Sequence, residues 1–443
     1  MTSATQRLAA AHVLREPLVL AAGAILVLGV AVAVSFAPLT TLYVTAAVTI
    51  VLICNVRVEL AVLALVASGP LELTYPVSVG SQLTPTKVVG ALAFVTFALN
   101  AFATSRRIVF DRAHGIVLMI LAIAMLSTLQ TSDVGGALAT TSRYGSFVAL
   151  FFVVSQFAGD HRLQRRIAWT LSIGSTVTGF LAVREFLAGH ALLARLPQAD
   201  PNDVAFVLAT TLPLTLWLLR ERGVRRLLII AMVGMMSLAI VLTFSRGALV
   251  GLGAGVLWKL LVDRGHIRVV LAGLVTAATA VLLIGFLAGG QVDTGLKAKG
   301  KIASSNVSTR LEAWHLAAKL AAERPLLGVG PGQFRNVYVQ ETDQLPGTRP
   351  LKVVHNAYLD VAAELGVVAG ILFLVYLGLA LTRAWSARLT GTGPPGLGEA
   401  LTVALLVGAI SALTLSEQYY APFWLLGALA AALWHEQRAR FGT

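Results

Sequence analysis

The stretch HNAYLDVAAELGVVAGILFLVYLGLALT, residues 355–382, joins a polar loop to a long apolar segment. From Asn356 to Thr382 the segment is long enough, at about 1.5 Å per residue, to cross a hydrocarbon core of about 30 Å. Similar apolar segments fill most of the chain on either side. The sequence therefore predicts a membrane protein whose polar chemistry gathers in the loop that ends at His355.

Composition favours the same class. The 443 residues are 57% hydrophobic and only 12% charged, and the mean hydropathy is +0.81. A chain this apolar is not a soluble domain. The net charge of +13 lies mostly in short loops, and no basic run interleaves aromatic residues, so we expect no nucleic-acid partner. The single cysteine, Cys54, allows neither an intrachain disulfide nor a thiolate metal cluster.

The apolar segments predict an all-α polytopic membrane protein. About fourteen are candidate spans: 17–35, 39–53, 58–68, 85–102, 113–130, 143–157, 167–187, 203–219, 226–243, 247–262, 269–287, 356–382, 401–416 and 422–434. The second and third are short, and a re-entrant pair is the alternative for them. The basic clusters in the connecting loops fall on one side, which the positive-inside tendency predicts to be the cytoplasm, together with both chain ends.

This pattern divides the chain into three parts. Residues 1–288 form an N-terminal bundle of about eleven spans, residues 289–355 an extracytoplasmic catalytic loop with short helices, and residues 356–443 about three C-terminal spans. The loop has nine basic residues against five acidic ones. Because this excess opposes the positive-inside tendency, it indicates anion binding.

Arg246 lies in Thr243-Phe244-Ser245-Arg246-Gly247, a turn too short to be a solvated loop, between two apolar segments. An arginine held at a membrane boundary usually has an anionic partner. A side chain that snorkels to a lipid phosphate is the alternative. Lys87, Arg143 and Arg195 fall with Arg246 on the side predicted to be extracytoplasmic.

Arg310 follows a helix-start signal in the loop. Thr309 and Glu312 fit a capping box, and the helix should stop at Pro325. Arg310 then occupies the first turn, where free N–H groups and the helix dipole favour a phosphate. A solvated surface arginine is the alternative. The glycine-rich residues 327–334 lack the lysine and strand of a nucleotide-binding loop and predict a tight, closely packed bend.

His355 opens a helix with Asn356, and Tyr358 follows on its face. A histidine at the boundary between loop and membrane can accept a proton near neutral pH. A hydrogen-bonded packing residue is the alternative. Only His190, His315 and His355 fall on the outer side, and they lack the HxH or HxxxH spacing of a zinc site, so we predict no metal. Glu364, deeper in the same segment, must be paired or functional.

A set of short motifs between Asp200 and Gly366 resembles the O-antigen ligase and O-antigen polymerase superfamily. The motifs are, in chain order, Asp200-Pro201-Asn202, Ser245-Arg246-Gly247, Arg310 with Trp314, Pro325 to Gly332, His355-Asn356 and Glu364-Leu365-Gly366. Each is short, but their order along the chain makes the set specific.

The resemblance implies a glycosyltransferase with a helical membrane fold of the GT-C type. Its donor would be a glycan on undecaprenyl pyrophosphate, at the outer face of the cytoplasmic membrane, and its acceptor lipid A-core or another surface glycan. Arg246 and Arg310 would hold the pyrophosphate, and His355 would be the catalytic base. Residues expected to bind substrate are Arg143, Lys87, Asn202, Asn356, Tyr358, Glu364 and Gly330. The reaction would be inverting, without cofactor or metal, and membrane lipids would be the other partners.

Four functions stay open at this point. A ligase, a polymerase that joins repeat units and a protein O-oligosaccharyltransferase need the same donor site, and two spans beyond a twelve-span ligase pattern leave the choice undecided. A lipid-linked glycan transporter is the fourth. Transport predicts inverted repeats with broken helices in both halves, and the single long loop argues against it.

Overall fold

The computed structural model describes residues 58–74, 84–197, 199–262, 310–341, 353–416 and 418–442. The chain divides into two compact units, residues 1–60 and 61–443, and the second contains nearly all the described residues. Within the described residues every regular element is a helix, and no strand occurs. The predicted all-α class is therefore confirmed.

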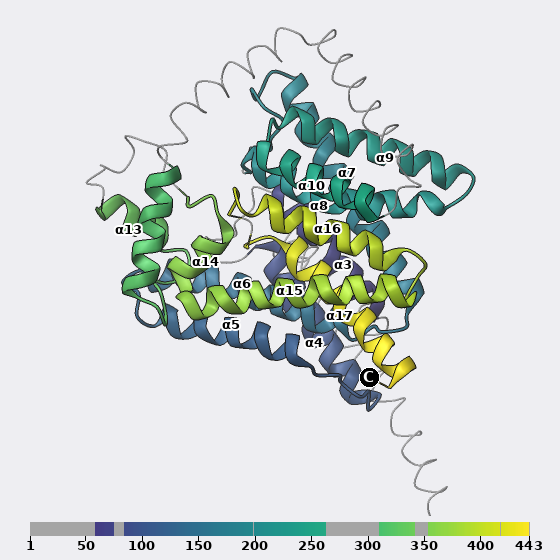
Figure 1. Cartoon of the computed structure of the whole chain (residues 1–443), viewed down its shortest axis with the longest axis horizontal. Helices are drawn as coiled ribbons and strands as arrows, with labels where there is room; N and C mark the ends of the chain where they lie inside the picture. The colour runs from purple at the N-terminus through teal and green to yellow at the C-terminus, as the bar shows by residue number, and fades with distance from the viewer. Residues whose placement is uncertain are drawn as a thin grey trace, which may run out of the picture. The chain divides into compact units, whose positions relative to one another are not determined.

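The helices are numbered in chain order, and Figure 1 labels the α-helices. They are α3 (Val58–Leu71), η1 (Glu72–Thr74), α4 (Pro85–Ala103), α5 (Arg112–Thr128), α6 (Val134–Ser155), α7 (His161–Leu187), α8 (Pro201–Trp217), η2 (Leu218–Arg220), α9 (Val224–Leu242), α10 (Arg246–Val262), α13 (Phe334–Glu341), α14 (Ala357–Leu365), α15 (Val367–Thr390), α16 (Leu397–Ser411) and α17 (Ala421–Phe441). One further helix covers residues 310–323 of the loop.

The lengths and composition of these helices suit a membrane. Among the described residues, five helices are long and apolar enough to cross one: α4, α6, α8 with η2, α9 and α15. The α5 and α16 helices are apolar but shorter. The α7 and α17 helices have 27 and 21 residues and carry charged residues near their ends. The chain is therefore a polytopic helical membrane protein.

The predicted spans overlap the helices but differ clearly at two points. The span predicted at 143–157 belongs to α6, which already begins at Val134 because Asp133 caps it, so Arg143 lies inside the helix. The predicted spans 17–35, 39–53 and 269–287 lie outside the described residues, and each of the others overlaps a helix. The segment 356–382, predicted as one span, is instead two helices, because Gly366 interrupts it with a φ of +90°. A Cβ at Gly366 would lie 2.6 Å from the backbone of Leu326. The loop backbone at Leu326 therefore occupies the space that a side chain at position 366 would need.

Short polar side chains define where several helices begin. Aspartates accept hydrogen bonds from first-turn N–H groups at the starts of four helices, and Thr84 does the same for α4. These N–H groups have no partner inside the helix, so the cap stabilises the start. The aspartates are Asp111 (α5), Asp133 (α6), Asp160 (α7) and Asp200 (α8). The cap at Asp200 fixes the first turn of α8, which belongs to the site described below.

The α17 helix passes through the core of the described helices. Its Trp424 is fully buried and stacks on Phe147 of α6 and Tyr376 of α15, with ring centroids 5.8 and 5.2 Å away. The Tyr376 hydroxyl donates to the Phe423 carbonyl at 3.1 Å. Large aromatic side chains packed in this way add stacking to their burial. They fix the start of α17 and hence the segment that leads into it.

The α10 helix packs closely on α16 through glycines one helical turn apart, Gly247, Gly251 and Gly255. A Cβ on Gly251 would lie 2.6 Å from the Val407 carbonyl oxygen. Small residues of this kind allow two helix backbones to approach. The contact holds Arg246, the first residue of α10, beside the end of α16.

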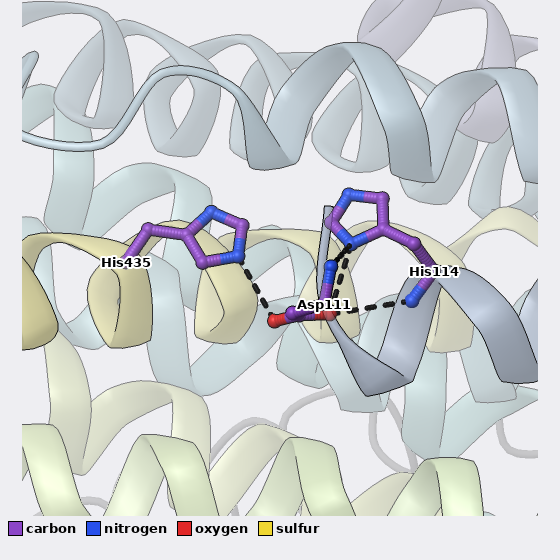
Figure 2. A group of neighbouring side chains, drawn as sticks. All are labelled: Asp111, His114 and His435. Atoms are coloured by element: carbon purple, nitrogen blue, oxygen red, sulfur yellow. Dashed lines mark hydrogen bonds and ion pairs between the residues drawn. The ribbon is translucent and has the colours of Figure 1, made fainter. Parts of the chain in front are cut away.

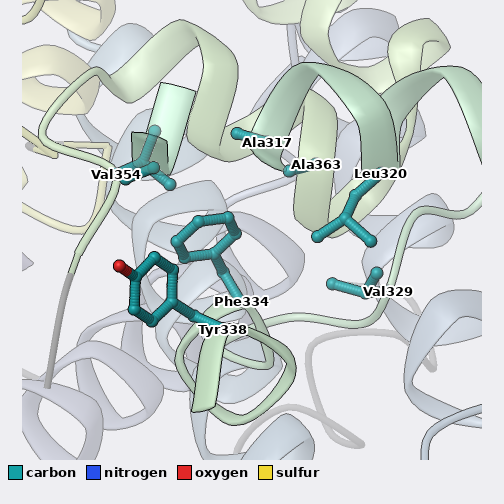
Figure 3. Packing of buried hydrophobic residues seen from close by; sticks show 8 residues of the cluster. Ala317, Leu320, Val329, Phe334, Tyr338, Val354 and Ala363 are labelled. Carbon is teal, nitrogen blue, oxygen red and sulfur yellow. The ribbon is translucent and has the colours of Figure 1, made fainter. Parts of the chain in front are cut away.

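The described part of the loop has a hydrophobic core of its own (Figure 3). Side chains from helix 310–323, α13 and α14 meet there, including Ala317, Leu320, Val329, Phe334, Tyr338, Val354 and Ala363. Helix 310–323 ends before Pro325, as predicted. Thr309 lies outside the described residues, so the predicted capping box stays a prediction. The Glu312 carboxylate accepts a hydrogen bond from the Tyr338 hydroxyl at 3.1 Å and so ties the helix to α13.

Candidate active site

Arg246 is presented by the turn between α9 and α10. Thr243 stabilises that turn, because its hydroxyl donates to the Ile240 carbonyl at 2.6 Å and accepts the Ser245 N–H at 3.2 Å. Phe244 takes a positive φ of 51°, which reverses the chain within three residues. Arg246 then begins α10 with an exposed side chain. The first-turn N–H groups of α10 add positive potential at the same place.

Arg310 lies in the same neighbourhood, although it is far from Arg246 along the chain. Its guanidinium is half-buried, and Nη1 donates to the Thr414 carbonyl at 3.4 Å. Burial lowers the pKa of Arg310, the nearby Asp200 carboxylate raises it, and the positive charge of Arg246 lowers it. The two arginines and Asp200 are therefore close enough to interact electrostatically. Two positive charges in one place suit a ligand with more than one negative charge.

His355 is bound by the segment between α16 and α17, which also contains Thr414. Its backbone N–H donates to the Ser416 hydroxyl at 3.0 Å, and its φ is +53°. The carbonyl of the preceding Val354 accepts the Trp314 indole N–H at 2.9 Å. Asn356 then caps α14, where its side chain accepts the N–H groups of Tyr358 and Leu359 at 3.1 Å each. The chain at His355 is thus fixed from both sides.

Residues 412–420, which we name the α16–α17 loop, connect these groups. Thr414 contacts Arg310 and also lies against Gly247, where an added Cβ would be 2.4 Å from its hydroxyl. Ser416 binds the backbone of His355. Thr414 and Ser416 are two residues apart, so their Cα atoms are separated by about 7 Å at most. The α16–α17 loop therefore contacts Arg310, the backbone of His355, and Gly247, which follows Arg246 in the chain.

The glycine-rich bend is bound to the end of α14. The N–H groups of Val329 and Gly330 each donate at 2.9 Å, to the carbonyls of Ala363 and Glu364. The Glu364 carboxylate in turn accepts the N–H groups of Gly332 at 2.8 Å and Phe334 at 3.3 Å, and also the hydroxyl of Tyr419. The predicted closely packed bend is confirmed.

Gly328→Ala tests this packing. Gly328 has a φ of +62°, and an added Cβ would lie 2.4 Å from the backbone of Glu364. We expect a loss of about 1–3 kcal/mol of stability from the backbone strain alone. The measurement is the thermal unfolding midpoint of the detergent-solubilised protein. The control is Gly378→Ala within α15, where nothing lies within 4 Å and alanine favours the helix. Equal midpoints for the two variants would contradict the described bend.

The remaining predicted substrate residues differ in their surroundings. Arg143 pairs with Glu72 at 2.7 Å and lies 5.8 Å from the ring centroid of Tyr420. The Lys87 ammonium donates to the Ala139 carbonyl at 2.7 Å. Asn202 lies in the first turn of α8, and its backbone N–H donates to Asp200. Their roles in binding stay a prediction.

Two other predicted substrate residues make internal contacts that shape the site. The Tyr358 hydroxyl donates to the Ala409 carbonyl at 2.7 Å, which joins α14 to α16. Gly330 faces Thr131, where an added Cβ would lie 2.0 Å from the threonine methyl group. Asn356 and Glu364 likewise make internal contacts, and the roles of all four residues in substrate binding stay a prediction.

The α16–α17 loop itself was missed in the sequence. Besides Thr414 and Ser416, it contributes Tyr419, which binds Glu364, and Tyr420, whose hydroxyl donates to the Asp203 carboxylate at 2.6 Å. Its one visible signal is the polar run Ser416-Glu417-Gln418-Tyr419-Tyr420 between two apolar segments. Nothing in that run indicates its distant partners.

The described part of the chain contains one group of side chains that could bind a metal: Asp111, His114 and His435. Their possible ligand atoms lie within 4.8 Å of one another. Figure 2 shows the aspartate between the two imidazoles, 2.9 Å from a ring nitrogen of each. The Arg383 guanidinium also lies 2.9 Å from this carboxylate. Burial opposes ionisation, but the hydrogen bonds with both histidines and the charge of Arg383 hold the pKa of Asp111 well below its usual range. The group therefore fits an ion-pair cluster between α5, α15 and α17 better than a cation site.

Comparison with known families adds one finding. Residues 231–374 match a family model described as O-antigen ligase. The matched region includes Arg246, Arg310, His355 and the glycine-rich bend. No curated protein matches the chain significantly.

Proposed function

We propose that this chain, whose residues 231–374 match a family model described as O-antigen ligase, is a glycan ligase. It transfers a glycan from undecaprenyl pyrophosphate to a hydroxyl of lipid A-core or another surface glycan. The site faces the outer side of the cytoplasmic membrane.

One observation carries this proposal: the α16–α17 loop binds Arg310 at Thr414 and the backbone of His355 at Ser416, and Thr414 also lies against Gly247, the residue after Arg246. A pyrophosphate leaving group needs its developing negative charge neutralised. Two guanidiniums provide that with planar, bidentate hydrogen bonds. In the proposed reaction His355, whose backbone is bound by the same loop, is the base that accepts the acceptor's proton.

The proposed reaction is a single displacement. The acceptor hydroxyl oxygen attacks the anomeric carbon while its proton passes to the His355 imidazole. The bond from that carbon to the pyrophosphate oxygen breaks, and lipid pyrophosphate leaves with the electron pair. The configuration at the anomeric carbon is inverted. Arg246 and Arg310 bind the departing pyrophosphate oxygens, so charge stabilisation needs no metal.

The test is reconstitution of the purified chain with a lipid-linked glycan and one acceptor at a time. Transfer to lipid A-core or another preformed surface glycan supports the ligase. Chain extension in the presence of donor alone would instead identify a polymerase with the same donor site. Transfer to a serine or threonine peptide would identify a protein O-oligosaccharyltransferase. Movement of the donor across the bilayer without any transfer would contradict the assignment as an enzyme and identify a transporter.

Chelation is expected to leave the rate of transfer unchanged. The arginines supply the positive charge that a divalent ion supplies in other phosphoryl or glycosyl transfer sites. The measurement is transfer after dialysis against EDTA, compared with the undialysed protein. A chelated protein that regains activity with one specific divalent ion, and with no other, would contradict this prediction.

Cysteine labelling from outside the cell tests the proposed orientation. Leu326, beside the glycine-rich bend, and Phe441, at the end of α17, have exposed fractions of 69% and 57%. In a background without Cys54, a membrane-impermeant maleimide is expected to label Leu326→Cys and to spare Phe441→Cys until the membrane is opened. The opposite labelling pattern would place the site on the cytoplasmic face.

A further inference from the structure

A second basic site lies at the other end of the same helices. A cavity of about 580 Å³ opens between α5, α15 and α17, lined by Asp111, Arg112, Leu379, Thr382, Arg383, Ser386, Trp434 and Arg438. The candidate active site is near the C-terminal end of α5, where the Ser127 hydroxyl donates to the Leu327 carbonyl. The cavity is at the N-terminal end of α5. Along α15, Arg383 lies about 26 Å from Gly366 at 1.5 Å per residue, which is close to the thickness of a bilayer core.

The lining has three arginines and one carboxylate. Arg383 is already oriented, because it pairs with Asp111 at 2.9 Å and lies 5.8 Å from the Trp434 ring centroid. The side chains of Arg383 and Asp111 are only 8% and 6% exposed. Asp111 is also bound to His114 and His435, so its charge is compensated inside the protein. With three arginines against one carboxylate, the charged side chains that line the cavity are mostly positive.

Exposed apolar residues lie farther along the helices that form the cavity. Leu379 and Trp434 form part of its wall. Farther along α15, Ile371, Leu374 and Val375 have exposed fractions of 55%, 51% and 44%. On α5, Leu118 and Met119 are exposed by 39% and 51%. A ligand that fits this combination has a phosphate at one end and long hydrocarbon chains at the other.

We propose that this cavity binds the phosphate of an anionic membrane phospholipid. The headgroup pairs with Arg112 and Arg438, beside the fixed Arg383. The acyl chains follow the exposed apolar residues of α5 and α15. Guanidinium groups bind phosphate oxygens with charge-assisted hydrogen bonds, and basic pockets between membrane helices are suited to anionic headgroups. The site is distinct from the proposed glycan donor site, and it does not depend on the proposed function.

The experiment is lipid retention measured by native mass spectrometry. The full chain is reconstituted in nanodiscs of equal phosphatidylglycerol and phosphatidylcholine and then released into detergent. The cavity variant is Arg112→Ala with Arg438→Ala. The matched control is Arg162→Ala with Arg222→Ala, which removes the same charge at two exposed arginines outside the cavity. We expect phosphatidylglycerol retention to fall about tenfold in the cavity variant and to stay unchanged in the control.

Equal retention by the wild type and the cavity variant would overturn the proposal. So would an equal loss in the control, because retention would then follow net charge alone. Displacement of the lipid by millimolar inorganic phosphate or glycerol 3-phosphate would show a site for free phosphate and overturn the lipid assignment.

A second measurement does not depend on how well the cavity variant folds. Phosphatidylglycerol with brominated acyl chains quenches nearby tryptophan fluorescence. The wild type is expected to be quenched more than Trp434→Phe, because Trp434 lines the cavity. Brominated phosphatidylcholine should not produce that difference. Identical quenching of the wild type and Trp434→Phe by the brominated phosphatidylglycerol would place the lipid elsewhere.

Discussion

Arg310→Lys is expected to lower glycan transfer by about 10²–10³-fold, the usual cost of losing one donor that stabilises developing negative charge. Lysine keeps the positive charge but cannot make the planar two-point contact with a phosphate. Its shorter reach also loses the contact between the guanidinium and the Thr414 carbonyl. We expect a comparable loss for Arg246→Lys, because this residue begins α10 beside the same loop.

The measurement is initial transfer rate at saturating acceptor, with expression and thermal midpoint recorded for each variant. The control is Arg195→Lys, an exposed arginine on the side predicted to be extracytoplasmic. It should transfer at the wild-type rate. If Arg310→Lys or Arg246→Lys also transfers at that rate, the residue has no role in holding the pyrophosphate. If the midpoint falls along with the rate, the loss reflects folding, and the proposal must be judged on binding of the lipid-linked donor.

Membrane helices and the glycine-rich bend could be predicted because their causes are local. A span needs only consecutive apolar residues, and a bend with φ values above zero needs glycine at the right places. Gly328, Gly330 and Gly332 have φ values of +62°, +113° and +71°. Gly366 shows the limit of this reasoning. A single glycine inside an apolar run gives no sign that another part of the chain will pack against it.

The contacts between distant residues that assemble the candidate site could not be predicted in the same way. Arg310 meets Thr414 across 104 residues, and His355 meets Ser416 across 61. The sequence suggested the two arginines and the histidine as candidates by their residue types and their positions next to apolar segments. It had no means of indicating a short loop as their common anchor, since serine and threonine before a span are ordinary.

Glu364 illustrates both sides of this limit. A carboxylate in an apolar segment was expected to be paired or functional. Its partners are backbone N–H groups 32 and 30 residues away and a tyrosine hydroxyl 55 residues away. Burial made some partner necessary, but which groups supplied it depended on how the loop folded.

His355 has a structural role and a proposed chemical role, and a pair of substitutions separates them. Its φ of +53° is a conformation that asparagine tolerates better than alanine or glutamine. Its backbone N–H, which binds Ser416, is unchanged in any substitution except proline. His355→Asn therefore preserves the turn but removes the base. His355→Ala removes the base and adds backbone strain.

If His355 is the base, both variants are expected to lose about 10²–10⁴-fold in transfer while they still bind the lipid-linked donor, because the arginines carry that binding. The wild-type rate should fall on the acid side as the imidazole becomes protonated and can no longer accept the proton of the hydroxyl. That acid limb should be missing from the residual activity of His355→Asn. The measurements are transfer rate against pH and donor binding for the wild type and both variants.

The opposite result would mean that another group accepts the proton of the acceptor hydroxyl. A His355→Asn variant that transfers at close to the wild-type rate, with its acid limb intact, would make His355 a residue of the turn only. Asp203 would then be the first group to consider, since it lies in the first turn of α8 next to the cap at Asp200 and accepts the Tyr420 hydroxyl of the α16–α17 loop. Glu364 is the weaker alternative, because two backbone N–H groups and Tyr419 already occupy its oxygens. Asp203→Asn in the His355→Asn background would decide between Asp203 and an acceptor hydroxyl that reacts without a base.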